Sequence, residues 1–287
     1  MADNEGSAHA KAPEVKVPVE AEPQNELTKK FTEKDWDAVK ELRTALPLII
    51  EEAVPTDPEG RFRVTDMWGV PLDPSRVDDA RVSVILLKFI KAVNYDVEEA
   101  TKRLIATIKW REEFKASETV NEEFPTEVFG TLGHVFGHDK EGRPITWNVY
   151  GGIDQQAVFG DLNRFLRWRV GLMERGLREV NFTTVDSMIQ VHDYLGASRD
   201  ANSKKAATAA SKLFTDYYPE LLHQKYFVNV PTLLTYVFWI FKPLLPAATF
   251  AKLKVVGVGP EVIGKELSQR IPIAELPKQY GGTAEGF

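Results

Sequence analysis

The 287-residue sequence contains no cysteine. This absence excludes disulfides, zinc–thiolate sites, iron–sulfur clusters and cysteine nucleophiles, so His, Tyr, Asp or Glu would have to hold any metal. The sequence also lacks an uninterrupted apolar run of the ~20 residues that a membrane-spanning helix needs. Positive charge is not in excess either, because 36 Lys and Arg against 42 Asp and Glu give a net charge of −6. We therefore expect no nucleic-acid partner.

Signals for secretion and for common catalytic sites are missing as well. The first residues include Asp3, Glu5, His9 and Lys11 where a signal peptide has an apolar run, so we expect a cytoplasmic protein. The sequence has no Gly-x-Ser-x-Gly elbow, phosphate loop or His-Glu-x-x-His pattern. The segment Gly257-Val-Gly259 lacks the third glycine of a dinucleotide site. We expect the protein not to be an enzyme.

The sequence divides into three parts. Residues 1–27 combine Ala, Pro, Glu and Lys without a periodic pattern, which predicts a disordered leader. Residues 28–118 repeat apolar side chains at three- and four-residue steps, as amphipathic helices do. Asp78 and Asp79 are suited to cap one of these helices, and Asp96 is suited to cap another. We expect this N-terminal region to be all helical, with residues 55–77 as a connection that includes a short helix.

Residues 119–287 alternate short β-rich runs with helical patterns. The predicted strands are 145–150, 187–194, 225–230 and 253–258, and the predicted helices are 162–180, 201–214, 232–245 and 260–269. Strands that alternate with helices are typical of right-handed crossovers and a mostly parallel sheet. We therefore predict an α/β domain behind an all-α region.

The predicted helix 232–245 is apolar on every side. Tyr236, Phe238, Trp239 and Phe241 point in several directions around it. Such a helix is either a central core helix or the cover of a lipid-sized cavity, which touches a bilayer when it opens. Its place between two strands puts it on a face of the sheet, and this position favours the cover.

The predicted strand 187–194 carries a polar row. Strand periodicity places Gln190, His192 and Tyr194 on one face, whereas a strand buried on both faces is normally apolar on both. The imidazole and the phenol either form a hydrogen-bonded pair in the core or serve as ligands. A phenolate oxygen suits ferric iron, and tyrosine is an established type of haem ligand.

Several ordered motifs are spread over residues 35–282: Leu86-Leu-Lys-Phe-Ile-Lys-Ala with Tyr95-Asp96, Trp110-Arg111, Tyr217-Tyr-Pro-Glu220, Lys225–Pro231, Phe241–Leu245, Thr249-x-x-Lys252 and Pro277-x-x-Tyr-Gly-Gly282. Together they resemble the CRAL-TRIO lipid-binding domain of the yeast secretory phosphatidylinositol-transfer family. The resemblance implies a CRAL-TRIO lipid-binding domain over residues 119–287, with a deep apolar pocket on one sheet face. A gating helix at about 232–245 would close the pocket and touch a membrane surface when it opens.

The resemblance also implies a site for the headgroup of phosphatidylinositol at Glu220, Thr249 and Lys252. There an ammonium and a hydroxyl would meet the phosphate, and a carboxylate would accept the inositol hydroxyls. Considered without the family, Glu220 would cap a turn and Lys252 would belong to a solvated surface. The intact order of the motifs favours the headgroup site.

Three segments narrow the resemblance: Arg167–Glu174, Gln190–Tyr194 and Tyr217–Leu222. They look most like a fungal branch of the family whose members bind haem. This branch implies ferric haem b as a cofactor. Its iron ligand would be Tyr194, with His192 close to the iron and Arg169 beside the group.

The sequence departs from the family pattern before Asp96. Many members are rich in arginine there, but this chain has Lys91, Val93 and Asn94, so we expect a weaker basic contact to the headgroup. A tyrosine of the haem-binding branch falls at Val93, which removes one contact beside the haem and leaves the ligand in place.

The resemblance thus implies a non-enzymatic protein that binds and transfers phosphatidylinositol and also carries haem. Such a protein would contribute to phosphoinositide homeostasis or to the response to haem and oxidants. We expect it in the cytoplasm, with peripheral association to the endoplasmic reticulum or other intracellular membranes. Two alternatives stay open, a haem-dependent enzyme that metabolises oxidants and a scaffold with a vestigial pocket. An open iron position with turnover would favour the enzyme, and the lack of a co-purifying small molecule would favour the scaffold.

Overall fold

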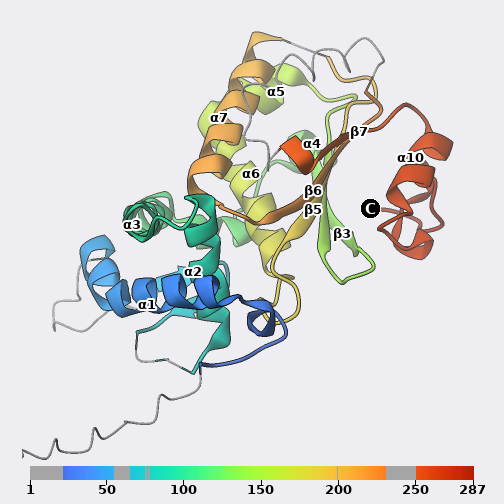
Figure 1. Cartoon of the computed structure of the whole chain (residues 1–287). Coiled ribbons are helices and arrows are strands. Elements are labelled where there is room, and N and C mark those ends of the chain that lie inside the picture. The colour runs from blue at the N-terminus through green and yellow to red at the C-terminus, as the bar shows by residue number, and fades with distance from the viewer. Residues whose placement is uncertain (1–21, 55–64, 75, 77, 199, 231–249) are drawn as a thin grey trace, which may run out of the picture.

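Three capped helices form the N-terminal region (Figure 1). The computed structural model describes residues 22–54, 65–74, 76, 78–198, 200–230 and 250–287. The three helices are α1 (Glu33–Ala53), α2 (Ala80–Ala92) and α3 (Val97–Phe114). Each begins after a residue whose side-chain oxygen accepts a backbone N–H of the first turn, namely Thr32, Asp79 and Asp96. The predicted caps Asp79 and Asp96 are confirmed, whereas Asp78 precedes the cap of α2 and does not cap it.

Helix α2 lies at the centre of this region. Ten of its thirteen residues are buried, because α1, α3 and the segment 65–72 pack around it. Helices α1 and α3 are amphipathic and bury side chains such as Leu42 and Leu104 in the shared core. Each fully buried leucine of this kind stabilises the fold by roughly 1.5–3 kcal/mol. The helical spacing in the sequence is therefore confirmed for these three helices.

Residues 65–72 form a β-hairpin, and the prediction of an all-helical region with a short helix here is wrong. The strands β1 (Thr65–Met67) and β2 (Val70–Leu72) pair antiparallel. Both turn residues, Trp68 and Gly69, have positive φ, at 57° and 85°, which is the combination typical of a tight hairpin turn. The Trp68 ring stacks on Phe89 of α2 with centroids 5.7 Å apart. Residues 55–64 lie outside the described residues.

The end of the predicted leader makes defined contacts. Glu22 pairs with Arg43 of α1 at 2.9 Å, and the Asn25 side chain donates to the carbonyl oxygen of Phe182 at 3.0 Å. Residues 22–27 therefore join the helical region to the part of the chain around residue 182. The rest of the predicted leader, 1–21, lies outside the described residues.

A five-stranded sheet forms the centre of the second region (Figure 1). Its strands, in spatial order, are β3 (Gly133–His138), β4 (Pro144–Val149), β5 (Met188–Asp193), β6 (Leu222–Val228) and β7 (Leu253–Val255). The edge strand β3 is antiparallel to β4, and the other pairs are parallel. The predicted α/β fold with a mostly parallel sheet is confirmed.

Helices cover both faces of the sheet (Figure 1). Helices α6 (Leu162–Leu177) and α7 (Ala201–Tyr217) lie on one side and α10 (Pro260–Leu267) lies on the other. Gly176 of α6 permits close approach to the sheet, because a Cβ there would come within 2.8 Å of a methyl carbon of Thr146. The remaining short helices are η1 (Thr28–Lys30), η2 (Ala116–Asn121), α4 (Thr126–Phe129), α5 (Gln155–Phe159), η4 (Ile273–Glu275) and η5 (Lys278–Tyr280).

A buried ion pair joins the two regions. Arg111 of α3 donates two hydrogen bonds to Glu174 of α6, at 2.6 and 3.1 Å, and the hydroxyl of Tyr218, which follows α7, donates to the same carboxylate at 2.6 Å. Both charged side chains are almost fully buried, with 2% and 4% exposed. Removal of one partner from such a pair costs about 3–5 kcal/mol, because the other charge is left buried and unpaired.

Candidate functional site

One face of the sheet carries a polar row where β4, β5 and β6 meet. In the parallel register, Asn148 lies beside His192, and His192 lies beside Phe227. A second row lies two residues earlier along each strand, where Gln190 is paired with Thr146 on one side and with Lys225 on the other. Paired residues of neighbouring strands point to the same side. These six residues form the inner face, which is directed toward α6, because the Gln190 side chain lies 3.6 Å from Met173 Sδ of that helix.

His192 is buried and has an unpaired ring nitrogen. Its exposed fraction is 5%, and its Nδ1 lies 3.3 Å from the hydroxyl of Tyr150. Its Nε2 has no hydrogen-bond partner in the described part of the chain. Burial above all, and then the charges of Lys225 and Arg169, hold the pKa of His192 well below its usual value. The imidazole is therefore neutral at pH 7.

Tyr194 follows β5 and continues its pairing, because its N–H donates to the Val228 carbonyl at 3.1 Å. Its half-buried ring lies 5.3 Å from the ring of Tyr150 and 6.2 Å from that of Phe227. His192 completes the group at 5.7 Å from Tyr150 and 5.8 Å from Phe227. The structure thus brings His192 and Tyr194 together, with Tyr150 and Phe227 as neighbours that the sequence did not single out. We call these four residues the aromatic cluster.

Arg169 extends from α6 toward the inner face. Its guanidinium lies 4.7 Å from the Phe214 ring, it is 3% exposed, and its Nη1 lacks a hydrogen-bond partner within the described ranges. Burial lowers the pKa of Arg169, while the hydroxyls of Tyr150 and other tyrosines raise it. Arg167 points elsewhere and binds Glu122 at 2.8 and 2.9 Å. This difference follows from the ~200° between the two positions on a helix.

Lys225 is a third polar group of the interior that the sequence did not single out. Burial, followed by the charge of Arg169, lowers the pKa of Lys225 to about 7, and its Nζ lies 5.3 Å above the Phe227 ring. The side chain nevertheless keeps some accessible surface. A residue that lines an internal recess is expected to be shielded from bulk water and yet to keep some accessible surface, as Lys225 does. A lysine that directly precedes the apolar run Tyr226-Phe-Val228 of a strand predicted to be buried was the signal that could have found it.

The two described headgroup residues lie side by side. Lys252 Nζ is 2.8 Å from Glu220 Oε2, with 28% and 38% of the side chains exposed. Glu220 has a φ of +54°, and Lys88 of α2 secures this turn by donating to its carbonyl oxygen at 2.9 Å and to Asp186 at the same distance. Thr249 and the predicted gating helix 232–245 lie outside the described residues.

The two groups of residues occupy opposite ends of the same strands. Glu220 and Lys252 precede β6 and β7, whereas Tyr150 and Tyr194 follow β4 and β5. Because these strands are parallel, the headgroup pair lies at their amino ends and the aromatic cluster at their carboxyl ends. A six-residue strand spans about 20 Å. One site therefore does not overlap the other.

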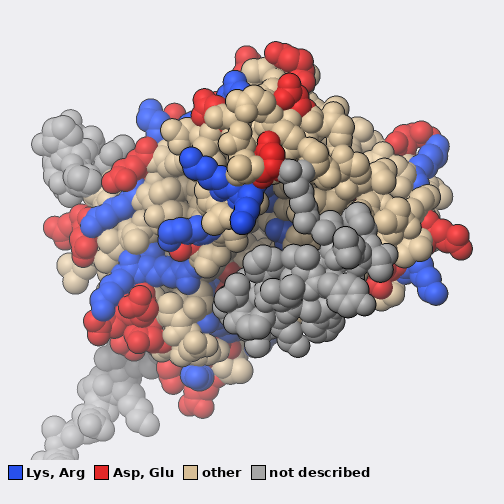
Figure 2. Space-filling view, turned by 90° about the horizontal axis from the view of Figure 1, so that it is seen from above, with Lys and Arg blue, Asp and Glu red and all other residues tan. Residues whose placement is uncertain are grey.

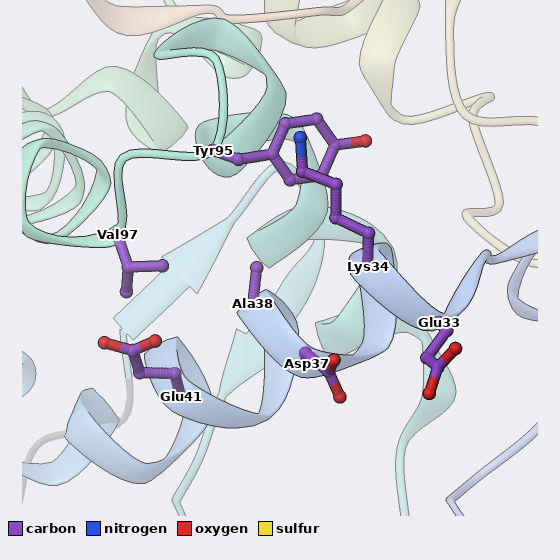
Figure 3. A pocket seen from close by; sticks show the side chains of 7 residues that line it. All are labelled: Glu33, Lys34, Asp37, Ala38, Glu41, Tyr95 and Val97. Carbon is purple, nitrogen blue, oxygen red and sulfur yellow. The ribbon is translucent and has the colours of Figure 1, made fainter.

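The residues before Asp96, Lys91 and Val93, contact the helical region and not the central sheet. Lys91 lies 3.6 Å from Asp35 of α1, and the half-buried Val93 packs against the helical core. Near them, an open groove of about 430 Å³ is lined by Glu33, Lys34, Asp37, Ala38, Glu41, Tyr95 and Val97 (Figure 3). Its three acidic side chains, Glu33, Asp37 and Glu41, repel anions and make this groove unsuited to a phosphate.

The described residues contain neither a membrane-spanning helix nor a metal-binding cluster of acidic and histidine side chains. None of the described helices is long and apolar enough to cross a bilayer. Within the same residues, no cluster of three or more His, Asp or Glu side chains could hold a metal ion.

Comparison with known proteins gives two family matches. The CRAL/TRIO domain matches residues 130–282, and the CRAL/TRIO N-terminal domain matches residues 25–106. The crystal structure of Sfh5 is similar to this chain with a TM-score of 0.71 and 29% sequence identity, over 88% of this chain and 89% of that one.

Relatives with the name phosphatidylinositol transfer protein sfh5 also match. The protein of Sclerotinia sclerotiorum is 39% identical over 241 residues, which are 77% of this chain and 57% of the relative. That of Meyerozyma guilliermondii is 34% identical over 280 residues, which are 89% of this chain and 80% of the relative. The chain spans little more than half of the length of the relatives from Sclerotinia sclerotiorum and Botryotinia fuckeliana, at 57% and 58%.

Proposed function

The chain belongs to the CRAL/TRIO family, and we propose that it is a non-enzymatic carrier that binds phosphatidylinositol and transfers it between membranes. The observation that carries the proposal is the ion pair of Glu220 and Lys252, which come together from segments 32 residues apart. The names of the relatives support the choice of lipid. We further propose that the interior holds ferric haem b through Tyr194.

The headgroup proposal follows from the chemistry of the pair. Both side chains are partly exposed, so a ligand can reach them. The Lys252 ammonium would bind the phosphate, and the Glu220 carboxylate would accept inositol hydroxyls. Thr249 would add a hydroxyl, and the segment 232–245 would act as the gate that contacts a membrane surface.

Basic side chains on one face support contact with an anionic membrane. Figure 2 shows Lys and Arg side chains on the face seen from above, some of them next to the grey residues, with Asp and Glu side chains among them. The Lys and Arg side chains attract anionic lipid surfaces, at about 1 kcal/mol for each charge near the surface. We propose that the protein works in the cytoplasm and associates peripherally with the endoplasmic reticulum or other intracellular membranes.

The inner face fits a haem group in three respects. Haem supplies four ring nitrogens of its own, so the protein would need to add only one or two ligands, and Tyr194 and His192, which lie close together, would hold the iron. The neutral His192 has an unpaired Nε2, and Arg169 has an unpaired Nη1 in the described part of the chain. The rings of Tyr150 and Phe227 offer flat contact surfaces. Bound haem would supply an iron centre that senses or stores oxidising equivalents, while Arg169 would stabilise the Tyr194 phenolate.

Lipid transfer tests the headgroup part of the proposal. Lys252→Ala and Glu220→Ala are each expected to reduce phosphatidylinositol transfer between vesicles at least tenfold, because each removes a charged hydrogen bond to the headgroup. Lys254→Ala is the matched control, since Lys254 lies two residues away and pairs with Glu266. Transfer that stays at the wild-type rate in both site variants would refute the assignment.

An absorption spectrum tests the haem part. Wild-type protein produced with haem supplied should show a Soret band, and Tyr194→Phe should lose or shift it, because the phenolate ligand is gone. Tyr217→Phe is the control, because the Tyr217 ring stacks on Trp110 at the helical region. The haem proposal fails if wild-type protein has no Soret band or if Tyr194→Phe keeps an identical one.

A further inference from the structure

A buried lysine of the helical region reaches the backbone of a headgroup residue. Lys88 lies on α2 and is 4% exposed. Its Nζ donates to the carbonyl oxygen of Glu220 and to Asp186 Oδ2, both at 2.9 Å. These two partners belong to the second region of the chain. Lysine is almost never fully buried unless it is paired, so the place of this ammonium next to Glu220 calls for an explanation.

The backbone of Glu220 has a conformation that needs support from its surroundings. Its φ of +54° lies in the left-handed region, which a residue with a Cβ keeps only where other contacts fix it. The neighbours Pro219 and Leu221 are buried, whereas the Glu220 side chain is directed outward. There 38% of it is exposed, and its Oε2 lies 2.8 Å from Lys252 Nζ. The direction of this carboxylate therefore depends on how the backbone behind it is held.

The Lys88 ammonium also acts on the charges of the headgroup pair. Burial lowers the pKa of Lys88, the charges of Asp186 and Glu220 raise it, and the charge of Lys252 lowers it. Asp186, Glu220 and Lys252 precede β5, β6 and β7, respectively. Two ammonium groups and two carboxylates thus form one cluster at the amino ends of the parallel strands, and Lys88 is its buried member.

The ion pair with Asp186 does not by itself account for the burial of Lys88. The Asp186 side chain is 39% exposed, and its second oxygen accepts a hydrogen bond from the Ser187 hydroxyl at 3.0 Å. A lysine at the surface could pair with such a carboxylate and keep its own hydration, which a buried lysine loses. The bond to the Glu220 carbonyl oxygen is the contact that requires an ammonium inside the protein.

A second basic residue of the helical region holds the segment that leads to Glu220. Arg103 of α3 donates through Nε to the carbonyl oxygen of Asp216 at 3.3 Å and through Nη2 to that of Thr215. Both carbonyls belong to the last turn of α7, where a helix leaves carbonyl oxygens without partners of its own. Side chains of α2 and α3 thus hold the segment from Thr215 to Glu220 at both ends.

We propose that Lys88 is a positioning residue of the headgroup site, which orients the Glu220 carboxylate toward the inositol hydroxyls by holding the Glu220 backbone. This inference rests on the proposed binding of phosphatidylinositol and adds to it a residue that acts from inside the protein. It gives the helical region a task in lipid recognition, because the bond runs from α2 to the segment before β6.

Lipid transfer by full-length variants of Lys88 tests this role. Lys88→Met should lower phosphatidylinositol transfer between vesicles about tenfold, because the Glu220 backbone loses its hydrogen-bond donor. Lys88→Arg should restore most of the rate, since a guanidinium can donate to both acceptors. Lys109→Met is the control and should transfer like wild type, because Lys109 is an exposed lysine of α3 that pairs with Glu52 at 3.3 Å. A wild-type rate in Lys88→Met would overturn the proposal.

Asp186→Asn separates the positioning role from the ion pair, and it decides the question even if Lys88→Met does not fold. This variant removes the countercharge of Lys88 and leaves the bond to the Glu220 carbonyl oxygen in place. It should lower the temperature of thermal unfolding, whereas transfer should stay within about twofold of wild type. A loss of transfer as large as that of Glu220→Ala would show that the site needs the ion pair and not the backbone bond, and would contradict the proposal.

A double variant shows whether Lys88 acts through Glu220. In a Glu220→Ala background, Lys88→Met should lower transfer further by less than about twofold, because the carboxylate to be oriented is absent. A further loss of about tenfold would indicate a general packing defect and overturn the positioning role. If Glu220→Ala alone transfers like wild type, the headgroup site and the role of Lys88 are both wrong. If Glu220→Ala lowers transfer and Lys88→Met does not, the site stands and the positioning role alone is wrong.

Discussion

The two faces of the central sheet are built from alternate residues of the same strands, but they differ in how well their polar groups are satisfied. The outer face packs Trp147, Val191 and their neighbours against α10. Its Trp147 Nε1 donates to the Phe136 carbonyl at 2.9 Å, and Tyr280 donates to Asp193. In the described residues this face has one buried polar atom without a partner, the Tyr226 hydroxyl, whereas the inner side has four.

The four unpaired atoms of the inner side are Thr146 Oγ1, Asn148 Oδ1, Arg169 Nη1 and His192 Nε2. Buried polar atoms in native proteins normally have partners, so a group of exceptions needs an explanation. The outer face is a well-packed hydrophobic core, and its burial stabilises the fold. We propose that the inner face is the side that binds a ligand, and its unpaired polar groups are expected to lower the stability of the protein without one.

The largest expected effect on stability concerns the outer face. Trp147→Ala should lower the free energy of unfolding by about 3–5 kcal/mol, because a fully buried ring that stacks on Tyr280 at 4.6 Å is removed. Phe227→Ala on the inner face should cost about 1–2 kcal/mol, because that ring is only half-buried, and should weaken haem binding. Urea denaturation measures both. Equal losses would contradict the division into a stabilising face and a binding face.

Two buried arginines allow a matched test of paired and unpaired charge. Arg111→Leu should cost about 3–5 kcal/mol, since it leaves Glu174 buried without its partner. Arg169→Leu should stabilise the empty protein, since it removes a buried charge and leaves no unpaired carboxylate behind. Thermal unfolding of ligand-free protein compares them, and a loss in Arg169→Leu as large as in Arg111→Leu would show an internal partner for Arg169.

The lowered pKa of Lys225 predicts a pH dependence of stability. The pKa is about 7 in the folded protein against 10.5 ordinarily, so the unfolded chain binds more protons between these values and wild-type stability rises with pH across this window. Below pH 7 the folded protein carries the charged Lys225 ammonium, and the full free-energy cost of burying this charge remains. Lys225→Met should therefore be more stable than wild type at pH 7, by at least about 1 kcal/mol, and the difference should shrink toward pH 10. A difference that stays constant with pH, measured against Lys205→Met at an exposed position of α7, would contradict this assignment.

The smallest expected effect concerns the hydrogen bond between Tyr150 and His192. Tyr150→Phe removes a contact of 3.3 Å, and a single hydrogen bond contributes about 1 kcal/mol. Haem affinity should therefore fall less than about tenfold, while the Soret band shifts slightly because the imidazole is oriented differently. An unchanged spectrum would show that Tyr150 does not orient His192.

Local patterns in the sequence were sufficient for much of the fold. The caps Asp79 and Asp96 and the alternation of strands and helices depend on neighbouring residues, so the sequence alone predicts them. The sequence did not predict the hairpin, because its strands have only three residues each and its turn contains Trp68 with a φ of 57°. A tryptophan is not a turn signal, and its conformation is held by stacking on Phe89, a tertiary contact.

The candidate site was predicted less completely. The polar row of His192 and Tyr194 follows from strand periodicity. Helix geometry implies only that one of Arg167 and Arg169 faces the inner side, and the family resemblance was needed to choose Arg169. Tyr150 and Lys225 depend on the register between strands, which only the folded sheet fixes. Glu220 and Lys252 are far apart in sequence, and the family resemblance alone connected them before the structure showed their contact.

Native mass spectrometry of protein produced with haem supplied tests the central claim, that the inner face binds haem through Tyr194. The account predicts wild-type protein with one bound haem b, loss of this adduct in Tyr194→Phe, and an unchanged adduct in the control Tyr217→Phe. A wild-type protein that carries phosphatidylinositol or nothing in its interior, with no haem adduct, would contradict it.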